Sequence, residues 1–167
     1  MGKAANSSIS LKQIHVTDNF WNKYVHLVKD VIIPYQWDIL NDKLEDVEPS
    51  HCIENFKIAA GEKEGEFQGA VFQDTDVAKW LEAVGFVLNY ERDEKLEELA
   101  DETIELIGRA QQPDGYLNTY FTIKEPDGRW SNLMEGHELY TAGHMIEAAV
   151  AYYEATGKRR FLEIVSK

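Results

Sequence analysis

Residues 79–100 read KWLEAVGFVLNYERDEKLEELA, and residues 144–165 read HMIEAAVAYYEATGKRRFLEIV. The two stretches align without gaps at a shift of 65 residues, which places Leu96 on Phe161. Each stretch has apolar residues at helical spacing, then a tight turn, then a second amphipathic segment. Because one helical hairpin cannot bury its own apolar face, such repeats stack side by side. The sequence therefore predicts an all-α fold built from stacked helical hairpins.

Helical periodicity also extends outside the repeat. We expect helices over residues 20–33, 35–46, 75–90, 94–110 and 135–156, and a tail or short strand over residues 1–13. Residues 55–61 are a short segment that Gly61 closes. Pro34 should end or kink the first of these helices, because proline has no N–H to donate. Asp74 or Thr75 is placed to cap the helix at 75–90, and Asp93 to cap the helix at 94–110.

The composition excludes several classes of function. The chain has 167 residues and a formal net charge of −13, which argues against a nucleic-acid partner and against an anionic membrane surface. No apolar run approaches the roughly 20 residues that span a bilayer. No targeting signal is read at the N-terminus, so the cytoplasm is the expected location. A small neutral ligand, such as a sugar, is compatible with this charge.

Polar residues follow one helical stripe within MEGHELYTAGHMIEAA, residues 134–149. His137 and His144 are seven residues apart, which at 3.6 residues per turn puts both rings on one face about 10 Å apart. That distance is too long for one metal ion, so no metal site is predicted. With Tyr140, the stripe offers hydrogen-bonding groups and apolar ring faces, as a sugar-binding wall requires. The alternative for His144 is a core histidine bonded to neighbouring backbone.

Two loop-like stretches hold further candidate residues. QQPDGYLNTYF, residues 111–121, offers Gln111 and Asp114 as binding groups, or else is only a helix end and a β-turn. FQDTDVAKW, residues 72–80, offers Asp74 and Asp76 as a possible acid and base, although acids at a helix start are also explained by capping and by the helix dipole. Without a second carboxylate at a known distance, no acid/base pair is assigned.

Several of these stretches together resemble glycoside hydrolase family 127, the β-L-arabinofuranosidases. The resemblance rests on VIIPYQWDILND, VFQDTDVAKWLEA, RAQQPDGYLNTYF and HELYTAGHMIEAAVAYYEATGK. It implies that residues 1–167 are the N-terminal part of an (α/α)6 barrel, which in this family is followed by β-sandwich domains. The family's HELY histidine contacts the furanose and falls on His137. The residues expected to bind the sugar are His137, Tyr140, Gln111, Asp114 and Asp76.

The resemblance also implies what this stretch lacks. In the family a zinc-bound cysteine is the nucleophile and a glutamate is the acid/base, and all of those positions lie beyond Lys167. Cys52, the only cysteine, matches none of them. We therefore expect no catalytic residue, metal ligand or cofactor in this chain, and zinc in the full-length parent. The expected parent activity is retaining hydrolysis of terminal β-L-arabinofuranosyl groups or related plant-cell-wall sugars, with the short chain inactive.

The second copy of the repeat stops at Lys167 after little more than two helical turns. We expect this end to truncate the barrel, which would leave helix faces uncovered and open to self-association. A natural end of the chain is the alternative. The competing function is a non-enzymatic helical module that binds a protein or a glycan.

Overall fold

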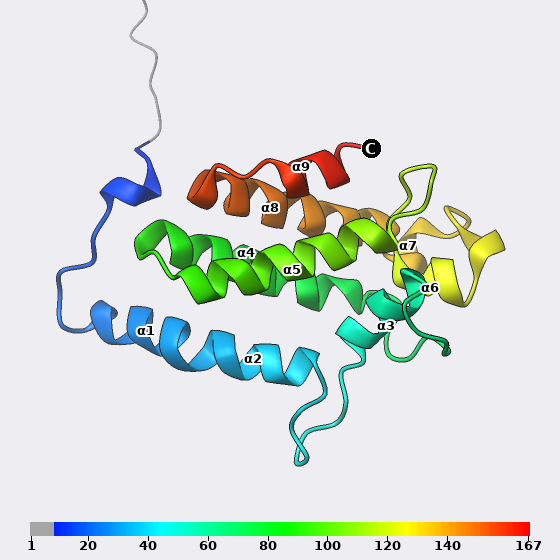
Figure 1. Ribbon diagram of the computed structural model, residues 1–167, viewed down its shortest axis with the longest axis horizontal. Helices are drawn as coiled ribbons and strands as arrows, with labels where there is room; N and C mark the ends of the chain where they lie inside the picture. Colours follow the sequence, from blue (N-terminus) through cyan, green and yellow to red (C-terminus); the bar gives the residue numbers. More distant parts are fainter. Residues whose placement is uncertain (1–8) are drawn as a thin grey trace, which may run out of the picture.

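The computed structural model describes residues 9–167, which form helices joined by loops (Figure 1). No β-strand occurs in these residues, which confirms the all-α prediction. In chain order the helices are η1 (Leu11–Gln13), α1 (Trp21–Leu27), η2 (Val28–Ile32), α2 (Ile33–Leu40), α3 (Cys52–Ala59), α4 (Asp74–Tyr90), α5 (Glu94–Ala110), α6 (Thr119–Ile123), η3 (Pro126–Gly128), α7 (Leu133–Gly136), α8 (Glu138–Thr156) and α9 (Arg160–Val165). Within the described part of the chain, no helix combines the length and apolar character needed to cross a membrane.

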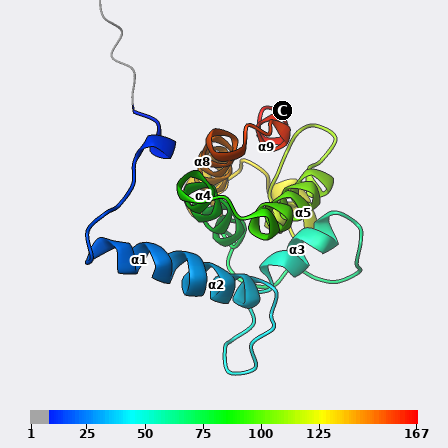
Figure 2. The same cartoon turned by 60° about the vertical axis from the view of Figure 1, so that its left-hand side comes forward.

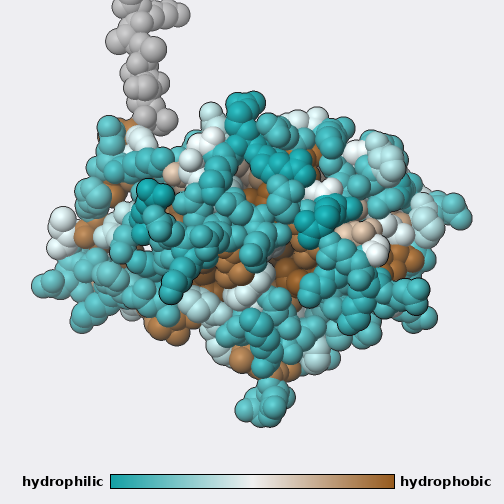
Figure 3. All heavy atoms as spheres, viewed as in Figure 1, coloured by the Kyte–Doolittle hydropathy of each residue, from teal (hydrophilic) through white to brown (hydrophobic). Residues whose placement is uncertain are grey.

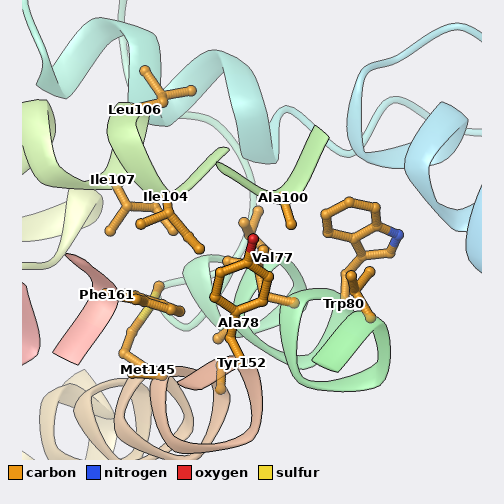
Figure 4. Packing of buried hydrophobic residues seen from close by; sticks show 14 of the residues in the cluster. Val77, Ala78, Trp80, Ala100, Ile104, Leu106, Ile107, Met145, Tyr152 and Phe161 are labelled. Atoms are coloured by element: carbon orange, nitrogen blue, oxygen red, sulfur yellow. The ribbon is translucent and has the colours of Figure 1, made fainter. Parts of the chain in front are cut away.

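Two helical hairpins, α4–α5 and α8–α9, form the centre of the molecule. Helix α4 lies beside α8 and α5 lies beside α9, so the second hairpin stacks on the first (Figures 1 and 2). The 65-residue repeat predicted this stacking. The apolar faces of the hairpins meet in a core where Met145, Tyr152 and Phe161 pack near Val77 and Ile104 (Figure 4). Each large side chain buried in this way contributes about 1.5–3 kcal/mol to folding.

Helices α4 and α8 approach each other closely at Gly85. A Cβ atom built on Gly85 would lie 2.8 Å from the backbone carbonyl carbon of Ala151 and 2.9 Å from the backbone nitrogen of Tyr152. Backbone atoms inside a helix cannot rotate away as a side chain can. The observed packing of α4 on α8 therefore requires glycine at this position.

Pro34 does not end its helix, contrary to one of the two outcomes predicted for it. The π-helical turn η2 precedes it, and the Ile33 N–H donates to the carbonyl of Val28, five residues back. This wider turn lets the helix continue into α2 although proline donates no hydrogen bond. The indole N–H of Trp80 then donates to the Ile33 carbonyl at 3.1 Å, which ties α2 to α4.

The helix predicted over residues 35–46 ends earlier, at Leu40. Asp42 has a positive φ of 55°, a conformation that no helix continues. Its carboxylate accepts hydrogen bonds from the backbone N–H groups of Ser50, at 2.6 Å, and His51, at 3.0 Å. These bonds close the loop that leads into α3, and they are made to residues too distant in sequence for helical periodicity to indicate.

The predicted helix caps are right in one case and wrong in the other. Asp93 accepts a hydrogen bond from the Leu96 N–H at 3.1 Å and so caps α5, as predicted. Neither Asp74 nor Thr75 caps α4, which has no side-chain cap. Of the tail or short strand predicted over residues 1–13, residues 11–13 form the 3-10 turn η1, and residues 1–8 lie outside the described part of the chain.

Exposed apolar side chains gather on two helix faces. One face, on α1 and η2, includes Trp21, Tyr24 and Val31. The other face, on α8, includes Leu139, Ile146, Val150 and Tyr153. The face drawn in Figure 3 is mostly hydrophilic, with apolar atoms along the middle, where α2 meets the central helices. Self-association through such faces stays a prediction.

Candidate functional site

His137 lies at a break between two helices. Its backbone is left-handed, with φ 52° and ψ 22°, so α7 ends at Gly136 and α8 begins at Glu138. The single helix predicted from about Glu135 is therefore wrong at this point. The His137 ring nitrogen Nδ1 lies 2.8 Å from the Glu135 carbonyl oxygen. Because a carbonyl only accepts, Nδ1 carries the proton, and Nε2 of the neutral ring is left as an acceptor.

The structure brings His137 and Tyr140 to one cavity. This cavity has a volume of about 350 Å³ and is lined by Phe72, Lys79, Leu133, Met134, His137 and Tyr140. The ring centroids of His137 and Phe72 are 5.2 Å apart, and those of His137 and Tyr140 are 5.9 Å apart. Lys79 Nζ lies 5.3 Å from the centroid of the Tyr140 ring. The cavity thus combines apolar ring faces, an imidazole and an ammonium group.

The sequence analysis did not predict four of the lining residues, Phe72, Lys79, Leu133 and Met134. Phe72 and Lys79 belong to FQDTDVAKW, the stretch from which only Asp76 was selected as a sugar-binding residue. Lys79 follows Thr75 by one helical turn and its Nζ lies 3.3 Å from the Thr75 hydroxyl. The helical spacing therefore indicates which face of α4 carries Lys79. The residues of α7 and α8 that complete the cavity come more than 50 residues later, and this spacing does not predict them.

His144 is half-buried behind Tyr140, against whose ring it packs edge-on at 4.6 Å between centroids. Its Nδ1 lies 3.3 Å from a carboxylate oxygen of Glu147, one turn further along α8. The bond from His144 to neighbouring backbone, which was the alternative interpretation, is not found among the described residues. The polar stripe from His137 through Tyr140 to His144 does exist, although its first member precedes the helix.

Asp76 lines a neighbouring cavity of about 680 Å³, which it shares with Gln73, Lys79 and Trp80 among others. One Asp76 carboxylate oxygen accepts a hydrogen bond from the Gln73 side-chain amide at 3.2 Å. Burial raises the pKa of Asp76, and the positive charge of Lys79 opposes that rise. Lys79 borders both cavities, so Asp76 lies next to the His137 cavity without lining it.

Gln111 and Asp114 lie apart from the other three predicted residues. The Gln111 side-chain amide donates to the carbonyls of Gly115, at 2.9 Å, and Ile164, at 2.7 Å, which fastens the 111–119 loop to α9. The Asp114 carboxylate accepts from the Tyr116 N–H at 3.1 Å. Both residues line a third cavity, of about 300 Å³. The structure gives them contacts that stabilise this loop, and their contact with a sugar stays a prediction.

Asp74 is a buried carboxylate with a partner far along the chain. It is 2% exposed, and it accepts hydrogen bonds from the Thr119 N–H at 2.7 Å and the Thr119 hydroxyl at 2.5 Å. Burial raises the pKa of Asp74 to about 6, although the two bonds from Thr119 oppose that rise. Asp74 therefore joins the start of α4 to the start of α6 and does not cap its own helix.

We expect an Asp74→Asn variant to differ from the wild type in its pH dependence. The folded-state pKa of Asp74 is raised above the ordinary 3.8, so the folded state binds the proton more tightly than the unfolded state. The wild-type free energy of unfolding should then fall, by about 2 kcal/mol, as the pH rises from 4 to 6. Asparagine can accept from the Thr119 N–H and donate to its hydroxyl, so this loss should vanish. Urea unfolding at several pH values measures it, and parallel curves for the two proteins would contradict the assignment.

Glu138, next to His137, is a second buried carboxylate. It is 3% exposed and accepts a hydrogen bond from the Tyr116 hydroxyl at 2.5 Å. The backbone N–H of Trp130 donates to both of its oxygens, at 3.1 and 2.8 Å. Burial, together with this bond to Glu138, raises the pKa of Tyr116. Glu138 thus joins the start of α8 to two separate loops.

The described residues do not fit the thiolate zinc site that the family resemblance implies. Such a site needs deprotonated cysteines beside carboxylates. Cys52 is fully buried, and burial raises the pKa of its thiol to about 12. Within residues 9–167, three side chains place possible metal-ligand atoms within 4.8 Å of one another: Glu82, His144 and Glu147. This group contains no cysteine. No step that requires zinc is therefore assigned to this part of the protein.

Comparison with known proteins identifies the family of this chain. Residues 13–167 match the family model described as "Beta-L-arabinofuranosidase, GH127 catalytic domain". A non-reducing end β-L-arabinofuranosidase from Bifidobacterium longum subsp. longum is 42% identical over 170 residues, which cover 92% of this chain and 26% of that protein.

Two solved structures agree with this result. A GH127 β-L-arabinofuranosidase from Geobacillus stearothermophilus T6 is 66% identical, with a TM-score of 0.90 over 91% of this chain and 24% of that one. A GH127 β-arabinofuranosidase is 35% identical, with a TM-score of 0.84 over 95% and 25% of the respective chains. The chain thus spans about a quarter of the length of these relatives, and its hairpins form part of an α/α barrel, as predicted. The chain belongs to the GH127 β-L-arabinofuranosidase catalytic-domain family.

Proposed function

We propose that this chain forms part of the sugar-pocket wall of a longer glycosidase that hydrolyses terminal β-L-arabinofuranosyl groups with retention of configuration. The observation that carries the proposal is the cavity shared by His137 and Tyr140. Its imidazole has one nitrogen bonded to the Glu135 carbonyl, which leaves the other available to a sugar hydroxyl. The rings of Phe72 and Tyr140 offer apolar surface for the C–H face of a furanose.

The charges around this cavity suit a neutral sugar. Lys79 is the cationic lining residue, and Asp76 lies one turn before it on α4, in the adjacent cavity. An ammonium group and a carboxylate so placed can donate to and accept from neighbouring hydroxyls of one ligand. The net charge of −13 would disfavour an anionic ligand of the kind that basic patches bind.

In this proposal the catalytic groups belong to the remainder of the longer protein. The described residues supply a wall that binds and orients the sugar. The cysteine nucleophile, the acid/base glutamate and the zinc ion expected from the family would come from elsewhere in the barrel. We therefore expect no turnover by the 167-residue chain alone.

The test compares the 167-residue chain with a longer protein that contains it and the rest of the barrel. Both are assayed with zinc on an aryl β-L-arabinofuranoside. Activity in the longer protein alone is the expected result. Activity in the short chain would mean that catalytic groups lie within residues 1–167. Inactivity in both would contradict this substrate and favour either another sugar or a non-enzymatic binding module.

A further inference from the structure

Two left-handed residues lie close to the carboxylate of Glu138. Trp130 has a φ of 60° and His137 a φ of 52°, and neither is glycine. Side chains on Cβ make this conformation unfavourable, so it persists only where the surrounding contacts determine it. Glu138 accepts from the N–H of Trp130 and follows His137 directly in the chain. It is therefore in a position to hold both residues in this conformation.

The position of Glu138 is not explained by its place in the first turn of α8. An acid there interacts favourably with the helix dipole, but that effect needs no burial and no partner outside the helix. Glu138 is almost fully buried, and its donors, Tyr116 and Trp130, come from loops 22 and 8 residues away. These donors bond to its oxygens. Glu138 lines the third cavity, with Gln111 and Asp114, and does not line the His137 cavity.

The Tyr116 side chain is itself held firmly. It is 8% exposed, its ring packs edge-on against Trp130 at 5.3 Å, and the Arg129 guanidinium lies 4.1 Å from its centroid. On the other side of His137, Gly136 is buried against the Phe121 ring, and a Cβ there would lie 3.0 Å from it. The backbone of His137 is thus fixed on both sides, by Gly136 packing and by the Glu138 carboxylate.

We propose that Glu138 is a positioning residue for His137: its bonds to the Tyr116 hydroxyl and the Trp130 N–H set the left-handed turn that directs the imidazole into the sugar cavity. The inference rests on the proposed function, since it assigns Glu138 a part in that same site. In this role Glu138 acts through His137 and makes no contact of its own in the His137 cavity. It acts by keeping the start of α8, the 111–119 loop and the segment before His137 in one arrangement.

The test is a double-mutant cycle in the longer protein, with kcat and KM measured on an aryl β-L-arabinofuranoside. Glu138→Gln replaces one acceptor oxygen by a donor and should lower kcat/KM about fivefold. If Glu138 acts through His137, the double variant Glu138→Gln, His137→Ala should be no less active than His137→Ala alone. Effects that multiply would show that Glu138 acts independently, and would overturn the proposal.

Asp101→Asn is the matched control. Asp101 accepts a hydrogen bond from the Tyr152 hydroxyl at 2.7 Å, so this variant also removes the charged acceptor of a tyrosine. Tyr152 lies on α8, 15 residues after His137, which corresponds to about 22 Å along the helix axis. Asp101→Asn should lower stability and leave kcat/KM unchanged. If Glu138→Gln does not fold, Tyr116→Phe removes one of the bonds to Glu138, and the same cycle applies to it.

The outcomes separate this inference from the proposed function. If His137→Ala is impaired and Glu138→Gln and Tyr116→Phe are both fully active, the positioning role is wrong and the sugar site stands. If His137→Ala is fully active, the sugar site is wrong and the positioning role fails with it. If all three are impaired without further loss in the double variants, both are supported.

Discussion

Replacing His137 with alanine in the longer protein should lower kcat/KM for an aryl β-L-arabinofuranoside at least tenfold. That loss corresponds to about 1.4 kcal/mol of transition-state stabilisation. The physical reason is that the imidazole is held by the Glu135 carbonyl through Nδ1, and so offers Nε2 to the ligand in a fixed orientation. Alanine removes that acceptor and leaves a void beside Phe72.

The second histidine of the polar stripe provides the comparison for this result. His144 is half-buried behind Tyr140, and His144→Ala should mainly lower the melting temperature. Steady-state kinetics and thermal unfolding are measured on both variants. Unchanged kinetics in His137→Ala would remove that residue from the site, and a loss of activity in His144→Ala without a change in melting would reverse the two roles.

Gly85→Val should destabilise the chain by about 3 kcal/mol or more, because the added atoms would overlap the α8 backbone at Ala151. The helices must separate to admit the side chain, and the core between them then loses contacts. Gly85→Ala should also destabilise, although alanine favours helix formation by up to about 1 kcal/mol over glycine. Chemical unfolding of the 167-residue chain measures both changes.

Gly143, in the interior of α8, is the matched control for Gly85. A Cβ built on Gly143 meets nothing within 4 Å among the described residues. Gly143→Ala should therefore stabilise the chain by up to about 1 kcal/mol through helix propensity alone. If Gly85→Ala were equally stabilising, the close approach of α4 and α8 would not be what requires glycine at that position.

Periodicity predicted the helices of the repeat well, because their apolar faces pack on each other. It failed where contacts between distant residues decide the backbone. Gly136 is the one residue of MEGHELY that weakens a helix locally. The left-handed residue is not this glycine but His137, which lies beside the carboxylate of Glu138 and its distant donors. The early end of α2 has a similar cause, since Asp42 bonds to backbone eight and nine residues further on.

The candidate site was predictable only in part, for a related reason. His137 and Tyr140 were found because they share a helical stripe and reach one cavity. Gln111 and Asp114 were selected as loop residues, but a loop's own hydrogen bonds can use such groups, as the bond from Gln111 to Ile164 shows. The capping pattern at Asp74 concealed its bond to Thr119, 45 residues away, which no local rule indicates.

Gly85, at the contact between α4 and α8, also affects how evenly the hairpins of the barrel can be spaced. The repeat places Val150 of α8 where Gly85 stands in α4, and Val150 is 43% exposed. A helix that packed on α8 as α8 packs on α4 would meet this branched side chain. Interaxial distances range from about 8 to 10 Å according to the side chains at the contact, so that neighbour would stand further off. If the next helix of the barrel packs on α8 in this way, we expect it to lie further from α8 than α8 lies from α4.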